Sequence, residues 1–145
     1  MNKLFTKRIV LGAGLGFLFG ILCFAGFSSK PDIPVEMAKW QDWNLSNPWL
    51  WGTLTSRVLL GFVVGLAGVV AKCPLTGRRI PAWLRGLKIG VLVSLPTALG
   101  ALTNSNHDMA IGGFWIVLVA GGFIGLIVDL FLTRLVGEGK ILCEE

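Results

Sequence analysis

The sequence predicts an all-α integral membrane protein whose single domain, residues 1–145, is an antiparallel bundle of four transmembrane helices. Hydrophobic residues make up 54% of the chain and charged residues only 14%, and the mean hydropathy is +0.74, outside the usual range of soluble domains. Four apolar stretches are each long enough to cross the roughly 30 Å hydrocarbon layer as a helix. Most Lys and Arg residues flank these stretches on one side, which is typical of cytoplasmic segments.

The four apolar stretches define the expected elements in order. The predicted spans are residues 9–27, 48–71, 83–103 and 111–135. The first contains no charged residue and is followed by a poor small-residue cleavage site, so we interpret it as a retained anchor rather than a signal peptide. The second begins at Asn47-Pro48, a pair typical of a helix start.

The longest connection, residues 28–47, is expected on the outer side of the membrane. Its apolar residues recur at three-residue spacing over about 34–43, which predicts a short helix lying on the outer leaflet. The alternative is a loop that packs over the bundle. The other outer connection, residues 104–108, is short and polar.

A basic turn, residues 72–88, determines the expected orientation. It carries five of the 13 Lys and Arg residues, and ten of the 13 fall on its side of the predicted bundle. Short basic segments stay in the cytoplasm, so we expect both termini on the cytoplasmic side of a cell's inner or plasma membrane. Five of the six tryptophans fall at the opposite interface.

The net charge of +5 does not indicate a nucleic-acid partner. A nucleic-acid interface would place the cations along one face with aromatic residues between them, whereas here the cations flank apolar spans. The expected partner is therefore the lipid bilayer.

Small residues recur at four-residue spacing in every predicted span, so they lie on one face of each helix. Such faces let helix backbones approach closely in lipid, where hydrophobic association is weak. They either hold one chain together or face another subunit, so a homo-oligomer or a second membrane protein is an expected partner. The glycines expected to pack helices are Gly12, Gly16, Gly20, Gly61, Gly65, Gly90, Gly121 and Gly125.

Arg57 is the first candidate binding residue, because Trp49 and Trp51 place it about 10 Å below the outer interface at helical rise. One interpretation is that its side chain extends back to the outer water. The other is that it faces another helix, because it continues the stripe of Gly61 and Gly65, and contacts an anion or a carboxylate inside the bundle.

Asp129 is the second candidate and lies near the inner boundary. A carboxylate facing lipid is unfavourable, so it should face protein or water. We expect either a structural ion pair with Arg8, Arg85 or Lys88, or a role in binding a proton or cation. Arg57 and Asp129 belong to opposite leaflets and are not expected to pair with each other.

Ser94, Pro96 and Thr97 form the third candidate, near the centre of the third span. A proline removes a backbone donor, so a helix broken here would expose carbonyl and hydroxyl groups to an ion or substrate. The alternative is a simple kink in which the two hydroxyls satisfy the free backbone groups.

No catalytic activity, metal or cofactor is expected. The chain contains no HExxH, GxSxG or GxxxxGK[ST] pattern, and His107, the only histidine, supplies at most half of a metal site. The sequence therefore predicts a non-catalytic assembly or accessory subunit of a membrane complex, because its spans are nearly devoid of the polar residues that a wet pore needs. The alternative is a small oligomeric channel or transporter for an ion or small solute.

Overall fold

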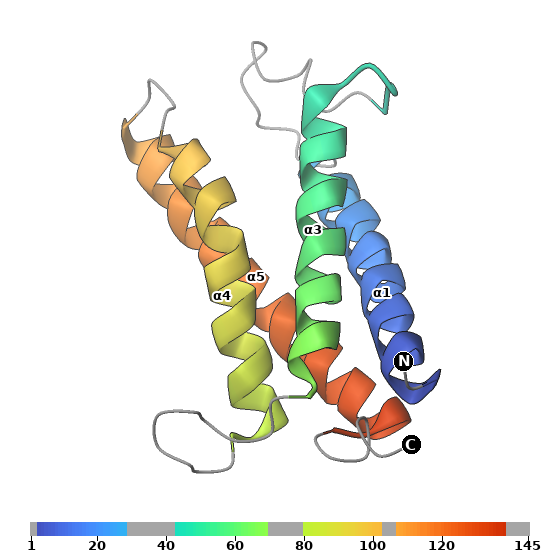
Figure 1. Ribbon diagram of the computed structural model, residues 1–145. Helices are drawn as coiled ribbons and strands as arrows, with labels where there is room; N and C mark the ends of the chain where they lie inside the picture. The colour runs from blue at the N-terminus through green and yellow to red at the C-terminus, as the bar shows by residue number, and fades with distance from the viewer. Residues whose placement is uncertain (1–2, 29–42, 70–79, 103–106, 139–145) are drawn as a thin grey trace.

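The computed structural model describes residues 3–28, 43–69, 80–102 and 107–138, which form four helices (Figure 1). The helices are α1 (Lys3–Ser28), α3 (Pro48–Ala67), α4 (Ala82–Ala101) and α5 (His107–Val136). Each is long and apolar enough to span a membrane. The prediction of an all-α bundle of four helices is thus confirmed, and the short helix expected at 34–43 lies outside the described residues.

The helix bounds differ from the predicted spans mainly at the polar ends. α1 begins at Lys3 rather than residue 9, and α5 begins at His107, which the sequence had assigned to a connecting loop. In contrast, α3 ends at Ala67, before the predicted residue 71. The hydropathy pattern identifies the segment that fits the hydrocarbon layer, whereas a helix continues into the interface wherever its backbone bonds are satisfied.

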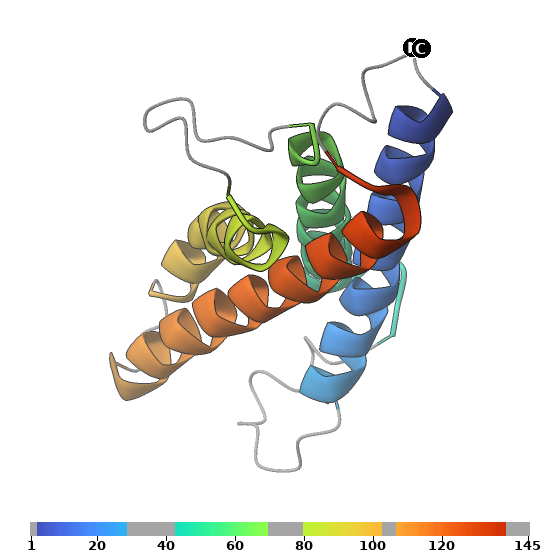
Figure 2. The same cartoon turned by 90° about the horizontal axis from the view of Figure 1, so that it is seen from below.

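The four helices form two closely packed pairs, the α1–α3 pair and the α4–α5 pair. The two pairs lie close together near the end where α1 begins and α5 ends, and they diverge toward the opposite end (Figure 1). α5 runs obliquely, so that its first half follows α4 and its second half crosses α3 and reaches α1 (Figure 2). Lys3 and Val136 therefore lie at the same end of the bundle.

Within each pair the backbones come into direct contact at glycine residues. A methyl group added to Gly12 or to Gly61 would collide with the carbonyl of the other residue. In the second pair, an added methyl group on Gly90 would collide with the carbonyl of Gly121. These contacts lie within one chain.

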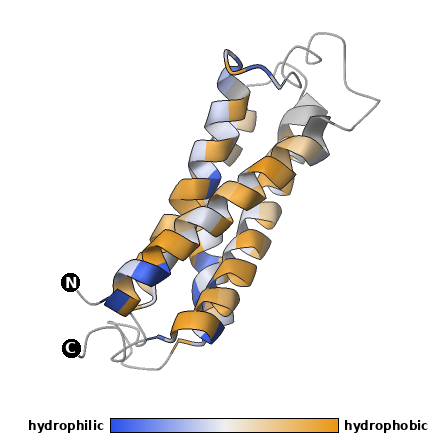
Figure 3. Cartoon of the chain, turned by 90° about the vertical axis from the view of Figure 1, so that its right-hand side faces the viewer, coloured by the Kyte–Doolittle hydropathy of each residue, from blue (hydrophilic) through white to orange (hydrophobic). Residues whose placement is uncertain are grey.

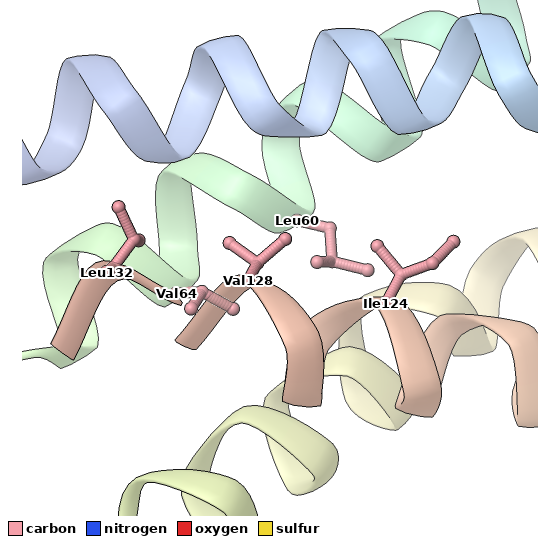
Figure 4. Close-up of a cluster of buried hydrophobic side chains, with 5 residues drawn as sticks. All are labelled: Leu60, Val64, Ile124, Val128 and Leu132. Atoms are coloured by element: carbon pink, nitrogen blue, oxygen red, sulfur yellow. The ribbon is translucent and has the colours of Figure 1, made fainter. Parts of the chain in front are cut away.

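The two pairs meet around a small apolar core, in which α3 faces the second half of α5 (Figure 4). The residues of this core are Leu60, Val64, Ile124, Val128 and Leu132. The outward surface of the helices is also largely apolar along their length, as the hydropathy colouring shows (Figure 3). A buried core and an equally apolar exterior are what a lipid-embedded bundle requires.

Candidate functional site

Two polar clusters lie inside the bundle at different heights along the helices. The first, which we call the charge cluster, lies near the end where α1 begins. Its members come from α1, α4 and the C-terminal part of α5 with the residues just beyond it, and they are Arg8, Arg85, Asp129, Thr133 and Glu138. The second, which we call the Arg57 cluster, lies toward the opposite end and contains Arg57, Ser94 and Thr97.

Asp129 is the centre of the charge cluster and is completely buried. Arg8 Nη2 donates a hydrogen bond to its Oδ1 at 2.5 Å. Arg85 donates two hydrogen bonds, from Nε to Oδ2 at 2.8 Å and from Nη2 to Oδ1 at 3.0 Å. Such bidentate arginine–carboxylate bonds are among the strongest polar contacts in proteins. Both carboxylate oxygens are therefore satisfied by arginine.

Arg8 is also completely buried and links α1 to the end of α5. Its Nη1 donates to the carbonyl of Gly137, the residue after α5, whose φ of 90° favours glycine. The side chain of Arg8 passes directly over Gly68, where an added methyl group would collide with Arg8 Nε. A side chain at position 68 would therefore require Arg8 to shift from this path.

Thr133 and Glu138 complete the charge cluster. Thr133 Oγ1 accepts from Arg8 Nη2 at 3.2 Å and from Arg85 Nη2 at 3.3 Å. Glu138, which is partly exposed, accepts from Arg85 Nη2 at 3.0 Å. Two guanidinium groups thus face two carboxylates, and the formal charges of the cluster cancel.

The expected ion pair of Asp129 is confirmed for two of its three proposed partners. Arg8 and Arg85 bind the carboxylate, whereas Lys88 is exposed and forms no ion pair with a described residue. Asp129 and Arg57 do not contact each other, as the sequence predicted.

Arg57 is buried inside the bundle, with only 7% of its surface exposed. Its Nη1 donates to Ser94 Oγ at 3.0 Å, which joins α3 to α4. No carboxylate of a described residue forms an ion pair with Arg57, and its buried Nε has no hydrogen-bond partner in the described part of the chain. The structure therefore places the side chain in the interior, where its bond partner is a neutral hydroxyl.

A cavity of about 340 Å³ adjoins Arg57 and lies between the two helix pairs. All four described helices contribute to its wall. The lining residues are Cys23, Phe24, Gly26, Thr53, Ser56, Arg57, Thr97, Ile116, Val117 and Ala120. A second hollow of about 280 Å³ shares Thr53 and Thr97 with the cavity and extends to Pro48, where α3 begins.

Of the two alternatives at Pro96, the structure does not show the broken helix, because α4 continues as one helix from Ala82 to Ala101 with Pro96 inside it. Pro96 is exposed, so its ring lies outside the packed face of the helix. Ser94 is buried and binds Arg57, and Thr97 lines the cavity. The two hydroxyl residues therefore belong to the Arg57 cluster through their position on the helix face, and not through an opening of the backbone.

The apolar core separates the two polar clusters. Along α3, Leu60 and Val64 lie between Arg57 and Gly68, the glycine that contacts Arg8. The ten residue steps from Arg57 to Ala67, the last residue of α3, correspond to about 15 Å at helical rise. Ile124 and Val128 fill the same interval from α5. The buried residues of this core are all apolar, so none of them connects the two clusters by a hydrogen bond.

The sequence analysis did not identify Thr133 or Glu138 as members of the charge cluster. Of the two, only Thr133 could have been found from its spacing in the sequence. Thr133 follows Asp129 by four residues and so shares its helix face. The bond between Arg57 and Ser94 joins two residues that each continue a glycine stripe. No spacing rule indicated Glu138, because it lies beyond the end of α5.

Within the described segments, no group of three or more His, Cys, Asp and Glu residues is arranged to hold a metal ion. The described free thiol, Cys23, lies in the wall of the Arg57 cavity. In comparisons with known proteins, no family model, curated protein or solved structure matches this chain.

Proposed function

We propose that the chain is a small, non-catalytic integral membrane protein that acts as an assembly or accessory subunit of a membrane complex. The observation that supports this proposal is the apolar core between the two helix pairs. Leu60, Val64, Ile124 and Val128 separate the two polar clusters, whereas a pore through one chain would have to be wet. The buried charges of the charge cluster also form ion pairs with one another.

In this proposal the four helices cross a cell's inner or plasma membrane, with both termini in the cytoplasm. The supporting feature is the distribution of cations, ten of 13 on the side of residues 72–88. The glycine faces act as packing surfaces in lipid, where close backbone contact replaces hydrophobic association. The contacts of Gly12 with Gly61 and of Gly90 with Gly121 have the geometry that this role requires.

The same proposal gives the exposed face of α5 a share in subunit contact. Large apolar side chains recur there at four-residue spacing, and they are Val119, Phe123, Ile127, Phe131 and Leu135. Residues with this spacing form one continuous stripe along a helix. Part of such a stripe meets lipid, and part is available to a second copy of the chain or to another membrane protein.

Native mass spectrometry of the protein, extracted from its own membrane in a mild detergent, tests the proposal. The expected result is a foreign membrane protein bound in fixed ratio. As a control, the exposed charge at Arg134 is removed by Arg134→Gln, which should leave that ratio unchanged. A chain that is monomeric, with lipid as its only companion, contradicts the accessory-subunit proposal.

A small oligomeric channel or transporter is the second candidate, favoured by the buried Arg57 that adjoins the cavity without a carboxylate from the described residues. Its expected signature is a homo-oligomeric mass together with flux of a small solute into liposomes. Arg57→Gln should abolish that flux while Arg134→Gln retains it. Equal flux in Arg57→Gln and in the unaltered protein contradicts this candidate.

A further inference from the structure

We propose that the cavity beside Arg57 binds an oxyanion, a carboxylate or a phosphate, that carries an apolar portion. This inference goes beyond the proposed function, because the same site would serve an accessory subunit or a transporter. It depends on the donor geometry of Arg57 and on the hydroxyl and apolar side chains that line the cavity with it.

One edge of the Arg57 guanidinium group has no partner among the described residues. Its Nη1 is occupied by Ser94 Oγ at 3.0 Å. Nε is buried without a partner among the described residues, and none of them accepts a hydrogen bond from Nη2. The Nε and Nη2 groups form the edge that binds the two oxygens of a carboxylate or phosphate in parallel.

The burial of Arg57 makes such an anion favourable. Only 7% of the surface of Arg57 is exposed. A hydrogen bond to a neutral hydroxyl does not offset the free energy that its cation loses when water is removed. In a membrane-spanning helix this imbalance is unfavourable, so ionisable residues there generally pair with an opposite charge or line a wet cavity. An oxyanion in the adjoining cavity supplies both the charge and the hydrogen-bond acceptors.

The remaining cavity wall has a polar and an apolar part. Thr53 and Thr97 line it together with Arg57, and the structure records no hydrogen bond of their hydroxyls to described residues. The lining also contains the apolar side chains of Phe24, Ile116 and Val117. A volume of about 340 Å³ lies at the lower end of the range for small-molecule sites. The site thus suits a small amphiphile with its oxyanion at Arg57.

The ligand has two possible sources with this chemistry, an anionic lipid headgroup or a free carboxylate. The cavity lies between the helix pairs, and the hollow that shares Thr53 and Thr97 extends to Pro48 at the end of the bundle. An approach along this hollow suits a soluble anion, and an approach between the diverging pairs suits a lipid.

Cys23 provides a readout inside the site, because its thiol is partly exposed and lines the cavity. In a chain carrying Cys73→Ser and Cys143→Ser, the rate of maleimide labelling reports on occupancy. The probe is octanoate, with octanol as the neutral control. At about four times the Kd, octanoate should slow labelling about fivefold, because the free fraction of sites is 1/(1 + [L]/Kd).

Variants of the full chain separate binding from a change in fold. Arg57→Gln should lose the protection by octanoate, whereas Arg134→Gln, which removes an exposed cation, should retain it. Arg57→Lys keeps the charge without the two-pronged edge and should bind more weakly than the unaltered chain. Circular dichroism and the labelling rate without octanoate verify that each variant is folded.

Lipid nanodiscs distinguish the two sources. If phosphatidylglycerol protects Cys23 relative to phosphatidylcholine, and this protection requires Arg57, the oxyanion is a headgroup; protection by octanoate in phosphatidylcholine identifies a free anion. Either result supports the proposal. Equal protection by octanol, protection that persists in Arg57→Gln, or no protection by either anion overturns it.

Discussion

Asp129 and Arg57 are both buried charged residues in apolar helices, but they differ in the groups that bind them. Asp129 receives two guanidinium groups, and the second positive charge is balanced by Glu138 through Arg85. Arg57 receives only the hydroxyl of Ser94 from the described residues. A buried charge is stable when it is paired and hydrogen-bonded, so the first site has the character of a structural link and the second that of a binding site.

Asp129→Asn should strongly destabilise the protein. The substitution leaves Arg8 and Arg85 buried with one carboxylate fewer, and loss of one partner of a buried pair costs about 3–5 kcal/mol. The measurement is the thermal or denaturant unfolding of the protein in detergent micelles. Glu138→Gln is the matched control, because it also removes one carboxylate but at a partly exposed position with a single bond to Arg85.

The control variant should lose roughly 1 kcal/mol or less, since exposed ion pairs contribute little. Equal stability losses in Asp129→Asn and Glu138→Gln would show that the burial of Asp129 does not increase its contribution to stability. A fully stable Asp129→Asn protein would contradict the structural link itself.

At the scale of helices, backbone contact within the pairs depends on the absence of a side chain. Gly61 approaches Gly12 across the α1–α3 pair, and Gly90 approaches Gly121 across the α4–α5 pair. By contrast, Gly14 lies on α1 with no atom near its missing side chain. These positions have the same residue type and opposite environments, which makes them a test of the packing.

Gly61→Ala and Gly90→Ala should each destabilise the protein by about 1–3 kcal/mol, because the added methyl group forces the two backbones apart. Gly14→Ala is the control and should be neutral or stabilising by up to about 1 kcal/mol, because alanine favours the helix and meets nothing there. Unfolding in one detergent under the same conditions compares all three. A ranking in which Gly14→Ala is the most harmful would refute the close helix contacts.

The helices themselves were predictable from the sequence, but the arrangement of their partners was not. Hydropathy located all four, because a membrane span needs about 20 apolar residues in a row. A stripe of glycines occurs in every span, so the pattern allows many pairings and does not select α1 with α3. At Pro96 the sequence left a broken helix and a simple kink open, because a proline removes one backbone bond. The remaining bonds of α4 keep the helix continuous.

For the candidate site, too, the sequence indicated which residues matter but not which of them contact each other. The sequence identified Arg57, Ser94 and Asp129 because each is a polar residue in an apolar stretch. It did not reveal that Arg57 and Ser94 meet across the helix pairs, which depends on how the pairs are placed. Glu138 lies beyond the end of α5, where hydropathy contains no signal.

In the molecule as a whole, the two helix pairs are joined at one end and diverge at the other (Figure 1). The joined end contains the ion pair of Arg8 with Asp129 and the apolar core between α3 and α5. The diverging end contains the Arg57 cavity. One end therefore fixes the pairs relative to each other, and the other leaves space that a ligand can occupy.

The orientation of this asymmetric molecule in the membrane is predicted by its interface residues. Trp43, Trp51 and Trp115 are at least half exposed and lie at the diverging end, and Trp83 lies at the joined end near the basic turn. Tryptophans settle at both interfaces, whereas Lys and Arg remain on the cytoplasmic side, so the cations decide the direction. The joined end should face the cytoplasm and the Arg57 cavity should open toward the outer side.

Reporter fusions at both termini test this orientation. A protein that fluoresces only in the cytoplasm should be bright when fused to the N-terminus or C-terminus, because an even number of spans and the excess of ten cations over three place both on that side. Insertion after Thr76, in the basic turn, should also be bright, and insertion after Ser105 should be dark. Bright fusions at Ser105 with dark termini would reverse the orientation, and the Arg57 cavity would then open to the cytoplasm and to its soluble anions.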